Sequence, residues 1–334
     1  MSFMPSFLIS LAAVAVLFGI GYGGAAAGAG AVIGIFVPYA ALLLFLGGLV
    51  WKVADWANSP VPFRIPTTSG QQKSLDWIRR DPIDSPFTKG EVALRMALEV
   101  LFFRSLLKNT KTQLHHGKPV YATDLWLWLA AMIFHYSMLV VLLRHLRLFL
   151  AETPFFVTAI ERADGFMQVG VPVFYATSIG ILLGLLWLLS RRILNPMVRY
   201  ISLPNDYFPL LLLLGIAGSG FCLRYIDKTD IVAVKELTVG LATFSPAADA
   251  IANISPLFFG HLFLVAILFA YFPFSKLMHL AGVFLSPTRN LANNSRAERH
   301  INPWNPKVKM HTYEEYEDDF RDLMKEVGLP VEKE

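Results

Sequence analysis

The chain has 334 residues, of which 55% are hydrophobic and only 16% charged, and its net charge is +4. This composition is too apolar for a soluble domain and indicates a protein that crosses a membrane several times. The basic residues lie between apolar stretches, so they indicate membrane topology and not a nucleic-acid surface. The single cysteine, Cys222, excludes an internal disulfide and any iron–sulfur cluster or zinc site built from cysteines.

The first 51 residues carry no charged side chain, which is enough apolar sequence for two membrane spans. A Gly/Ala-rich run at 21–30 is the expected break, giving spans near 5–22 and 31–51. Small residues there would let the two helices pack closely on each other. We expect spans and not a cleavable signal, because no basic region precedes the apolar stretch and the stretch is too long.

Residues 52–123 form a polar segment that is rich in lysine and arginine. Prolines make much of this segment irregular, namely Pro60, Pro62, Pro66, Pro82 and Pro86. Residues 90–108 predict an amphipathic helix at the membrane surface. His115 and His116 precede Gly117 and are expected to be solvated loop residues.

Four further spans are predicted, at 124–150, 168–190, 208–226 and 257–276. Lysine and arginine gather in 52–123, in 191–207 and in the polar tail 280–334, whereas the opposite loops hold few. The positive-inside rule then predicts six spans in the cytoplasmic (inner) membrane, with both termini cytoplasmic. In the tail, 312–327 predicts a helix with one apolar stripe, which would dock on a partner or fold back on its own chain.

The histidines in the apolar spans lie in two places: His135 and His145 in one span, and His261 and His279 at the ends of the last span. On antiparallel helices the expected partners are His145 with His261 and His135 with His279. Ten residues separate the first two along a helix, a rise of about 15 Å, and an unbroken helix would set the other two about 27 Å apart on one face. Pro273 is expected to bend that helix towards the inner pair.

Each pair could hold one haem iron from both sides. Two axial histidines leave no open position, so the role would be electron transfer. Arg144, Arg147 and Lys276 lie near the membrane surfaces and would contact haem propionates or act as interfacial anchors.

Other readings remain open for these histidines. A histidine in a span is often only a hydrogen-bonded bundle residue, and zinc would need further ligands at each pair. A proton-coupled secondary transporter would favour carboxylates at mid-membrane, yet Asp124 lies only at the edge of its span. A structural membrane anchor without haem is the remaining alternative.

The histidine spacings resemble the ligand pattern of the gamma subunit family of respiratory nitrate reductase, a membrane dihaem cytochrome b. Residues 191–199 and 272–279 are also similar, and the resemblance covers about 120–280. It implies a four-helix core over 124–279 with two haem b groups. His145 and His261 would ligate the outer haem, and His135 and His279 the inner one. The chain departs from that family in having two spans before the first histidine-bearing span.

The segment 53–123, residues 286–293 and the acidic helix 312–327 resemble the M subunit of the Dsr membrane complex (DsrMKJOP) of sulfur-metabolising prokaryotes. This likeness implies an electron-transfer subunit acting on menaquinone or menaquinol. Its partners would be a cytoplasmic iron–sulfur subunit resembling heterodisulfide reductase and other subunits of a complex for dissimilatory sulfite reduction, a form of sulfate respiration. The quinol-site lysine of the nitrate reductase family has no match, so Arg162 and Lys235 are the candidates. The expected fold is an all-α integral membrane bundle of six transmembrane helices with a cytoplasmic segment and tail.

Overall fold

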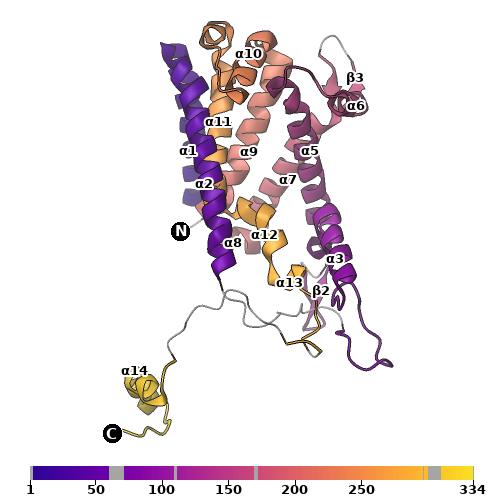
Figure 1. Ribbon diagram of the computed structural model, residues 1–334, viewed down its shortest axis with the longest axis vertical. Helices are drawn as coiled ribbons and strands as arrows, with labels where there is room; N and C mark the ends of the chain where they lie inside the picture. Colours follow the sequence, from indigo (N-terminus) through magenta and orange to yellow (C-terminus); the bar gives the residue numbers. More distant parts are fainter. Residues whose placement is uncertain are drawn as a thin grey trace.

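A computed structural model describes residues 3–59, 71–108, 111–168, 172–295, 297–299 and 310–333. These residues form a bundle of long helices with two short ribbons (Figure 1). Among them, six helices are long and apolar enough to cross a bilayer: Met4–Ala29, Val32–Asn58, Leu125–Phe149, Ala176–Leu194, Pro204–Asp227 and Pro256–Phe274. The predicted all-α bundle of six spans is therefore confirmed. The prolines at 60, 62 and 66 and the predicted span residues 169–171 lie outside the described residues.

The elements follow one another along the chain in a simple order. The helices are α1 (Phe3–Gly24), α2 (Val37–Asn58), α3 (Lys89–Phe102), α4 (Arg104–Leu107), α5 (Leu125–Phe149), α6 (Phe155–Asp164), α7 (Ala176–Leu194), α8 (Pro196–Ile201), α9 (Pro204–Cys222), α10 (Ile231–Ala242), α11 (Pro256–Tyr271), α12 (His279–Leu285), α13 (Pro287–Asn290) and α14 (Tyr313–Glu326). The strands are β1 (Lys111–His115) with β2 (Lys118–Ala122), and β3 (Gly165–Met167) with β4 (Phe174–Tyr175), each pair antiparallel. We call the bundle end where α5 begins the inner end, and the end where it finishes the outer end.

The break between α1 and α2 lies within the predicted Gly/Ala run, at Gly28, whose φ of +91° suits only glycine. The close packing predicted between these two helices is not what the structure has. Instead α1 packs chiefly on α11 and α9, and α2 packs on α11. A Cβ on Gly21 of α1 would come within 2.6 Å of Phe263 Cβ on α11. The small residue therefore brings α1 against the last span.

The four remaining spans stand in a row, with α5 packed on α7, α7 on α9, and α9 on α11 (Figure 1). The contact between α5 and α7 is close because Gly184 has no side chain, and a Cβ there would lie 3.0 Å from the Phe134 backbone nitrogen. Ile181, Leu185 and Leu213 form a buried cluster between α7 and α9. The spans α7 and α9 therefore connect the two histidine-bearing helices, α5 and α11.

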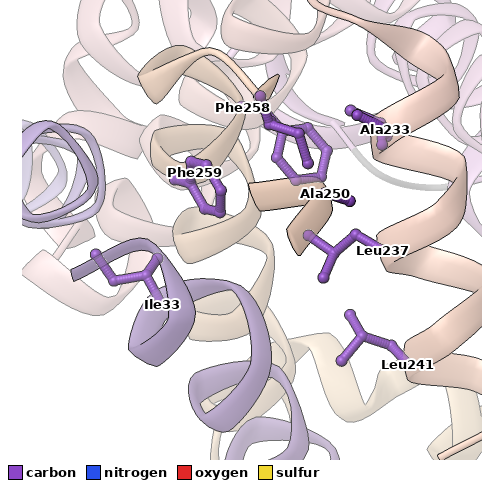
Figure 2. Close-up of a cluster of buried hydrophobic side chains, with 9 residues drawn as sticks. Ile33, Ala233, Leu237, Leu241, Ala250, Phe258 and Phe259 are labelled. Atoms are coloured by element: carbon purple, nitrogen blue, oxygen red, sulfur yellow. The ribbon is translucent and has the colours of Figure 1, made fainter. Parts of the chain in front are cut away.

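A separate core closes the outer end of the bundle. Leu237 and Leu241 of α10 pack with Phe258 and Phe259 of α11 and with Ile33 from the turn before α2 (Figure 2). The same helix α10 also packs on α5. Helix α10 thus connects α11 to α5 at the outer end.

The largest difference between a predicted boundary and the structure is at the start of the fourth span. The span expected to begin at 168 begins at Ala176, because α6 and the β3–β4 ribbon precede it. The Asp164 carboxylate accepts hydrogen bonds from the backbone N–H and the hydroxyl of Thr177, which fixes the start of α7. The expected loop at His115 and His116 is the tip of the β1–β2 hairpin, where His116 and Gly117 both have positive φ.

The amphipathic helix expected over 90–108 is two helices, because the chain turns at Phe103 between α3 and α4. The polar side chains of Arg95 and Glu99 are buried, and Leu94 and Leu101 are exposed. An outward apolar face of this kind suits a helix that lies against lipid.

The predicted tail helix is present as α14, which begins with a capping box formed by Thr312 and Glu315. The C-terminal residues fold back onto it, since the buried Glu317 carboxylate accepts the backbone N–H groups of Glu332 and Lys333. Apolar side chains of the predicted stripe are nevertheless exposed, namely Tyr313, Tyr316, Phe320, Leu323 and Val327.

Candidate haem sites

The inner histidine pair depends on a break in the last span. The sequence predicted one unbroken helix from His261 to His279, and this prediction is wrong. Helix α11 ends at Tyr271, and Ser275 is extended, with φ −124° and ψ 174°. Pro273 lies in the turn between them, where it lacks an N–H and its ring clashes with a continuing helix. His279 therefore begins a new helix, α12, so its direction is not set by the register of α11.

The break brings His279 next to His135 of α5. Their ring centroids lie 6.0 Å apart, and the ring planes are nearly perpendicular, at 81°. Two phenylalanine rings stand edge-on to His135, Phe134 at 4.7 Å and Phe103 at 4.9 Å between ring centroids. The inner pair that antiparallel spans predicted is thus brought together.

Hydrogen bonds fix the protonation of both rings. The Nδ1 atom of His135 lies 2.7 Å from the Ala131 carbonyl oxygen, and that of His279 lies 2.9 Å from the Lys276 carbonyl oxygen. A carbonyl can only accept, so each Nδ1 carries the proton and donates it. Each Nε2 then keeps a lone pair that can bind a metal ion, and the donated bond makes it a stronger ligand.

The Nδ1 atoms of the outer histidines also donate hydrogen bonds, but to different acceptors. His145 Nδ1 lies 2.7 Å from the Val141 carbonyl oxygen, one turn back along α5. His261 Nδ1 lies 2.9 Å from the Ser219 hydroxyl of α9, which donates its own proton to the Gly215 carbonyl at 2.7 Å. His261 therefore donates to Ser219, and its Nε2 is likewise available as a ligand.

The inner pair fits the geometry of an iron held from both sides. An iron–nitrogen bond of about 2.0 Å on each side, with about 1.1 Å from nitrogen to ring centre, separates two axial ring centres by about 6 Å. The measured separation of His135 and His279 is 6.0 Å. Among the described residues, no group of three or more His, Cys, Asp or Glu side chains is placed to hold a metal. Haem iron needs only two ligands from the protein, since the four nitrogen atoms of the porphyrin ring occupy the remaining coordination positions.

Arg144 is buried, so its guanidinium does not extend to the membrane surface. It pairs with Asp164 of α6 at 3.2 Å, and its guanidinium lies 3.8 Å from the centre of the Tyr175 ring. A second guanidinium, that of Arg224, lies 4.3 Å from the same ring. Two cations thus lie against one aromatic ring near the outer end of α5, and one of them, Arg144, pairs with the buried carboxylate of Asp164.

The other predicted contact residues are dispersed. Arg147 pairs with Glu161 at 2.8 Å, and Arg162 is exposed on α6. The Lys276 Nζ atom lies 2.6 Å from an Asp206 carboxylate oxygen, and the Lys276 carbonyl accepts the hydrogen bond from His279 Nδ1. Lys235 donates to the Ala151 carbonyl at 2.8 Å, and it lines a cavity of about 560 Å³ with Arg147, between α5 and α10.

Sequence reasoning missed the residues that support the histidines. Ser219 had one signal, a hydroxyl in an apolar span, and Arg224 had one, a positive charge near the end of a predicted span. Phe103 and Tyr175 gave no signal, because their roles arise from contacts between segments distant in the sequence.

Comparisons with known proteins agree with this architecture. The sequence pattern of the nitrate reductase gamma subunit family matches residues 108–296. The "Hdr-like menaquinol oxidoreductase cytochrome b-like subunit" of Archaeoglobus fulgidus is 48% identical over 282 residues, covering 83% of this chain and 84% of that protein. The protein of the same description from Archaeoglobus profundus is 43% identical over 279 residues, covering 82% of this chain and 83% of that one. The matched region contains the four histidines of the two pairs, His135, His145, His261 and His279. The chain belongs to the nitrate reductase gamma subunit family.

Proposed function

We propose that the chain is the dihaem cytochrome b of a membrane complex, carrying electrons between menaquinol and an iron–sulfur partner subunit. The observation that carries the proposal is the inner pair, with ring centres 6.0 Å apart and both Nδ1 atoms acting as donors. The description of the Archaeoglobus relatives as menaquinol oxidoreductase cytochrome b-like subunits supports it.

In this proposal His135 and His279 hold one haem b near the inner end, and His145 and His261 hold the other near the outer end. When bound, a bis-histidine haem supplies one-electron transfer with no open position for oxygen or substrate. The carbonyls of Ala131, Val141 and Lys276 keep the ligand rings oriented. His135 and His145 are ten residues apart on α5, about 15 Å along the bilayer normal.

Arg144 and Arg224 would neutralise the propionates of the outer haem. Both guanidinium groups lie on the Tyr175 ring, only Arg144 is paired with Asp164, and the Nε atoms of both arginines are buried without a hydrogen-bond acceptor among the described residues. A propionate would supply the missing negative charge and acceptors. Lys276 is already paired with Asp206, so it is a weaker candidate for the inner haem.

Menaquinol would bind in the cavity between α5 and α10, near the outer end. Apolar groups such as Leu148 and Val239 line it, with Lys235 and Glu236 among the charged ones. An apolar cavity with few polar groups suits a quinol ring and tail. Lys235 would donate a hydrogen bond to a quinol oxygen. Exposed Arg162 is the less suitable of the two candidates.

The partner would bind at the inner end. The polar segment and tail carry most of the lysine and arginine, which supports a cytoplasmic location for this end and for both termini. The exposed stripe of α14 would contribute a helix that lies in a groove of the partner. By the likeness to the Dsr complex, the partner resembles heterodisulfide reductase and serves dissimilatory sulfite reduction.

A haem measurement tests the proposal. We expect the purified chain to contain two haem b groups per polypeptide, by pyridine haemochrome analysis and dithionite-reduced spectra. A protein that folds, inserts in the membrane and shows no b-type bands would refute the proposal and leave a transporter or a structural anchor.

The quinol site has its own test. Lys235→Ala should slow the reduction of the haems by a menaquinol analogue and leave the haem content unchanged. Arg162→Ala tests the other candidate in the same assay, and we expect a smaller effect because Arg162 is exposed on α6. Equal rates in Lys235→Ala and the unmodified protein would exclude Lys235 as a quinol ligand.

A further inference from the structure

The inner histidine pair is joined to two segments outside the membrane spans, residues 71–108 and 286–295, which we call the clasp. The two segments meet at Asn293, which is buried. Its side-chain amide donates to the Ser85 hydroxyl at 3.0 Å, and its backbone N–H donates to the Pro86 carbonyl. Its own carbonyl accepts from the Gln72 side chain at 2.9 Å. A single residue thus connects the chain after α12 to the chain before α3.

Beside this junction, the buried carboxylate of Asp84 anchors α4. It accepts hydrogen bonds from Arg104 and, at 2.6 Å, from Lys108. Burial alone would raise the pKa of Asp84, but the hydrogen bonds and charges of Arg104 and Lys108 outweigh burial and lower that pKa to about 2. Glu99 accepts the backbone N–H of Ser105 at 3.0 Å, which caps the start of α4 from the other side. The turn between α3 and α4 is therefore held at both ends.

Phe103 forms that turn, and its backbone is in a left-handed conformation, with φ 48° and ψ 45°. This conformation is costly for a bulky residue and persists only where surrounding contacts impose it. The contacts here come from α5: Trp128 Nε1 donates to the Phe102 carbonyl, and the Tyr136 hydroxyl donates to the Leu101 carbonyl, each at 2.7 Å. The turn places the Phe103 ring edge-on against His135.

The segment 286–295 of the clasp follows directly on the helix that carries the second histidine, His279. His279 begins α12, α13 follows, and α13 packs on α3. Asn293 lies three residues beyond α13 and is bound to Ser85 and Pro86. Contacts therefore run without interruption from His135 through Phe103, α4 and Asn293 back to the helix that carries His279.

We propose that the clasp positions His135 and His279 relative to each other, and that Phe103 and Asn293 are its positioning residues. It thereby sets the midpoint potential of the inner haem while the outer haem is independent of it. The inference rests on the proposed function, because it concerns a haem held by these two histidines. Ligand orientation and the surroundings of the ligands are among the means by which a protein tunes a haem.

A redox titration of the full-length protein, reconstituted in lipid, tests the clasp. In Phe103→Leu and in Asn293→Ala we expect the midpoint potential and spectrum of one haem to shift, and those of the other to stay as in the unmodified protein. Phe102→Leu is the matched control, the same change at the neighbouring exposed phenylalanine, and should shift neither haem. His135→Ala identifies the inner haem, since only its signal should be lost. A loss of the inner haem alone in either clasp variant would also support the clasp.

Two results would overturn the inference. Unchanged potentials in both clasp variants, with two haems bound, would refute the clasp and leave the proposed function intact. Equal shifts at both haems would show a general loss of structure and would also refute it. Hydrogen exchange over 279–285 gives a readout on the chain itself and should rise in Asn293→Ala even without haem. A wild-type protein without haem would instead overturn the proposed function, and the claim about the potential with it.

Discussion

The two histidine pairs are built in opposite ways. His261 lies within an unbroken part of α11 and donates to Ser219 on the adjacent span, and buried charges lie near its partner His145. His279 lies beyond the break at Pro273, at the start of a helix of seven residues, and its surroundings come from segments outside the spans. The outer pair therefore depends on packing within the bundle, and the inner pair depends on contacts between segments that are far apart in the sequence.

This difference has a functional consequence. A site built within packed spans is rigid because neighbouring helices fix its ligands. A site whose ligand follows a helix break can be adjusted by whatever contacts the following segment. The end of the bundle where we place the iron–sulfur partner is thus the end whose ligand geometry is set from outside the membrane.

The largest expected effect is the loss of a haem. Replacing His145 or His261 with alanine should lower the haem content from two per chain to about one, because a single remaining axial histidine holds haem weakly. His135→Ala and His279→Ala should each remove the other haem. Pyridine haemochrome analysis measures the content, with His115→Ala in the exposed hairpin as the control. Loss of both haems, or of neither, from a single replacement would contradict the pairing.

A smaller effect is expected from the buried charges at the outer end. Asp164→Asn leaves Arg144 without its carboxylate, and breaking one side of a buried ion pair costs about 3–5 kcal/mol. The free energy of unfolding in detergent should fall by about that amount. Glu161→Gln, which breaks the more exposed pair with Arg147, should cost about 1 kcal/mol or less. Similar losses from both variants would mean that burial does not distinguish the two pairs.

At the inner end, the clasp should weaken in acid. The pKa of Asp84 is about 2 in the folded protein, below its ordinary value of 3.8, so its charged form stabilises the fold. That contribution, about 2 kcal/mol, is fully present above about pH 4 and is lost as the pH falls towards 2. Pepsin should therefore cleave residues 71–108 faster as the pH is lowered through this range. In Asp84→Asn the acid dependence should become smaller and not vanish, because the hydrogen bond from Arg80 also lowers the pKa of Glu91 in this segment to about 2. An unchanged acid dependence would exclude Asp84 as a cause.

The smallest effect concerns the hydrogen bond from His261 to Ser219. Ser219→Ala removes the acceptor of the Nδ1 proton and should cost about 1 kcal/mol of stability. His261 becomes a weaker electron donor to the iron, so the midpoint potential of the outer haem should rise. Ser219→Thr keeps the hydroxyl and serves as the control. A fall in potential, or a shift confined to the inner haem, would contradict the assignment of His261.

The sequence predicted the six spans and the proximity of His135 and His279, because apolar length and antiparallel order are properties of the chain alone. Pro273 even signalled the place where the last span departs from a straight helix, although a full break was not foreseen. Phe103, Asp84 and Asn293 could not be predicted, since their roles depend on contacts across up to about two hundred residues. The ion pair of Arg144 could not be predicted either, because its partner Asp164 lies on α6, outside the span that carries Arg144.

Electron paramagnetic resonance of the oxidised, purified protein tests the central claim most directly. Two axial histidines at each iron predict two low-spin ferric haem signals. The ring planes of His135 and His279, at 81° to each other, predict that the inner signal is strongly anisotropic, because perpendicular imidazoles leave two iron orbitals nearly equal in energy. His135→Ala should remove this signal and leave the other. High-spin signals at both haems, or no haem signal at all, would contradict the account.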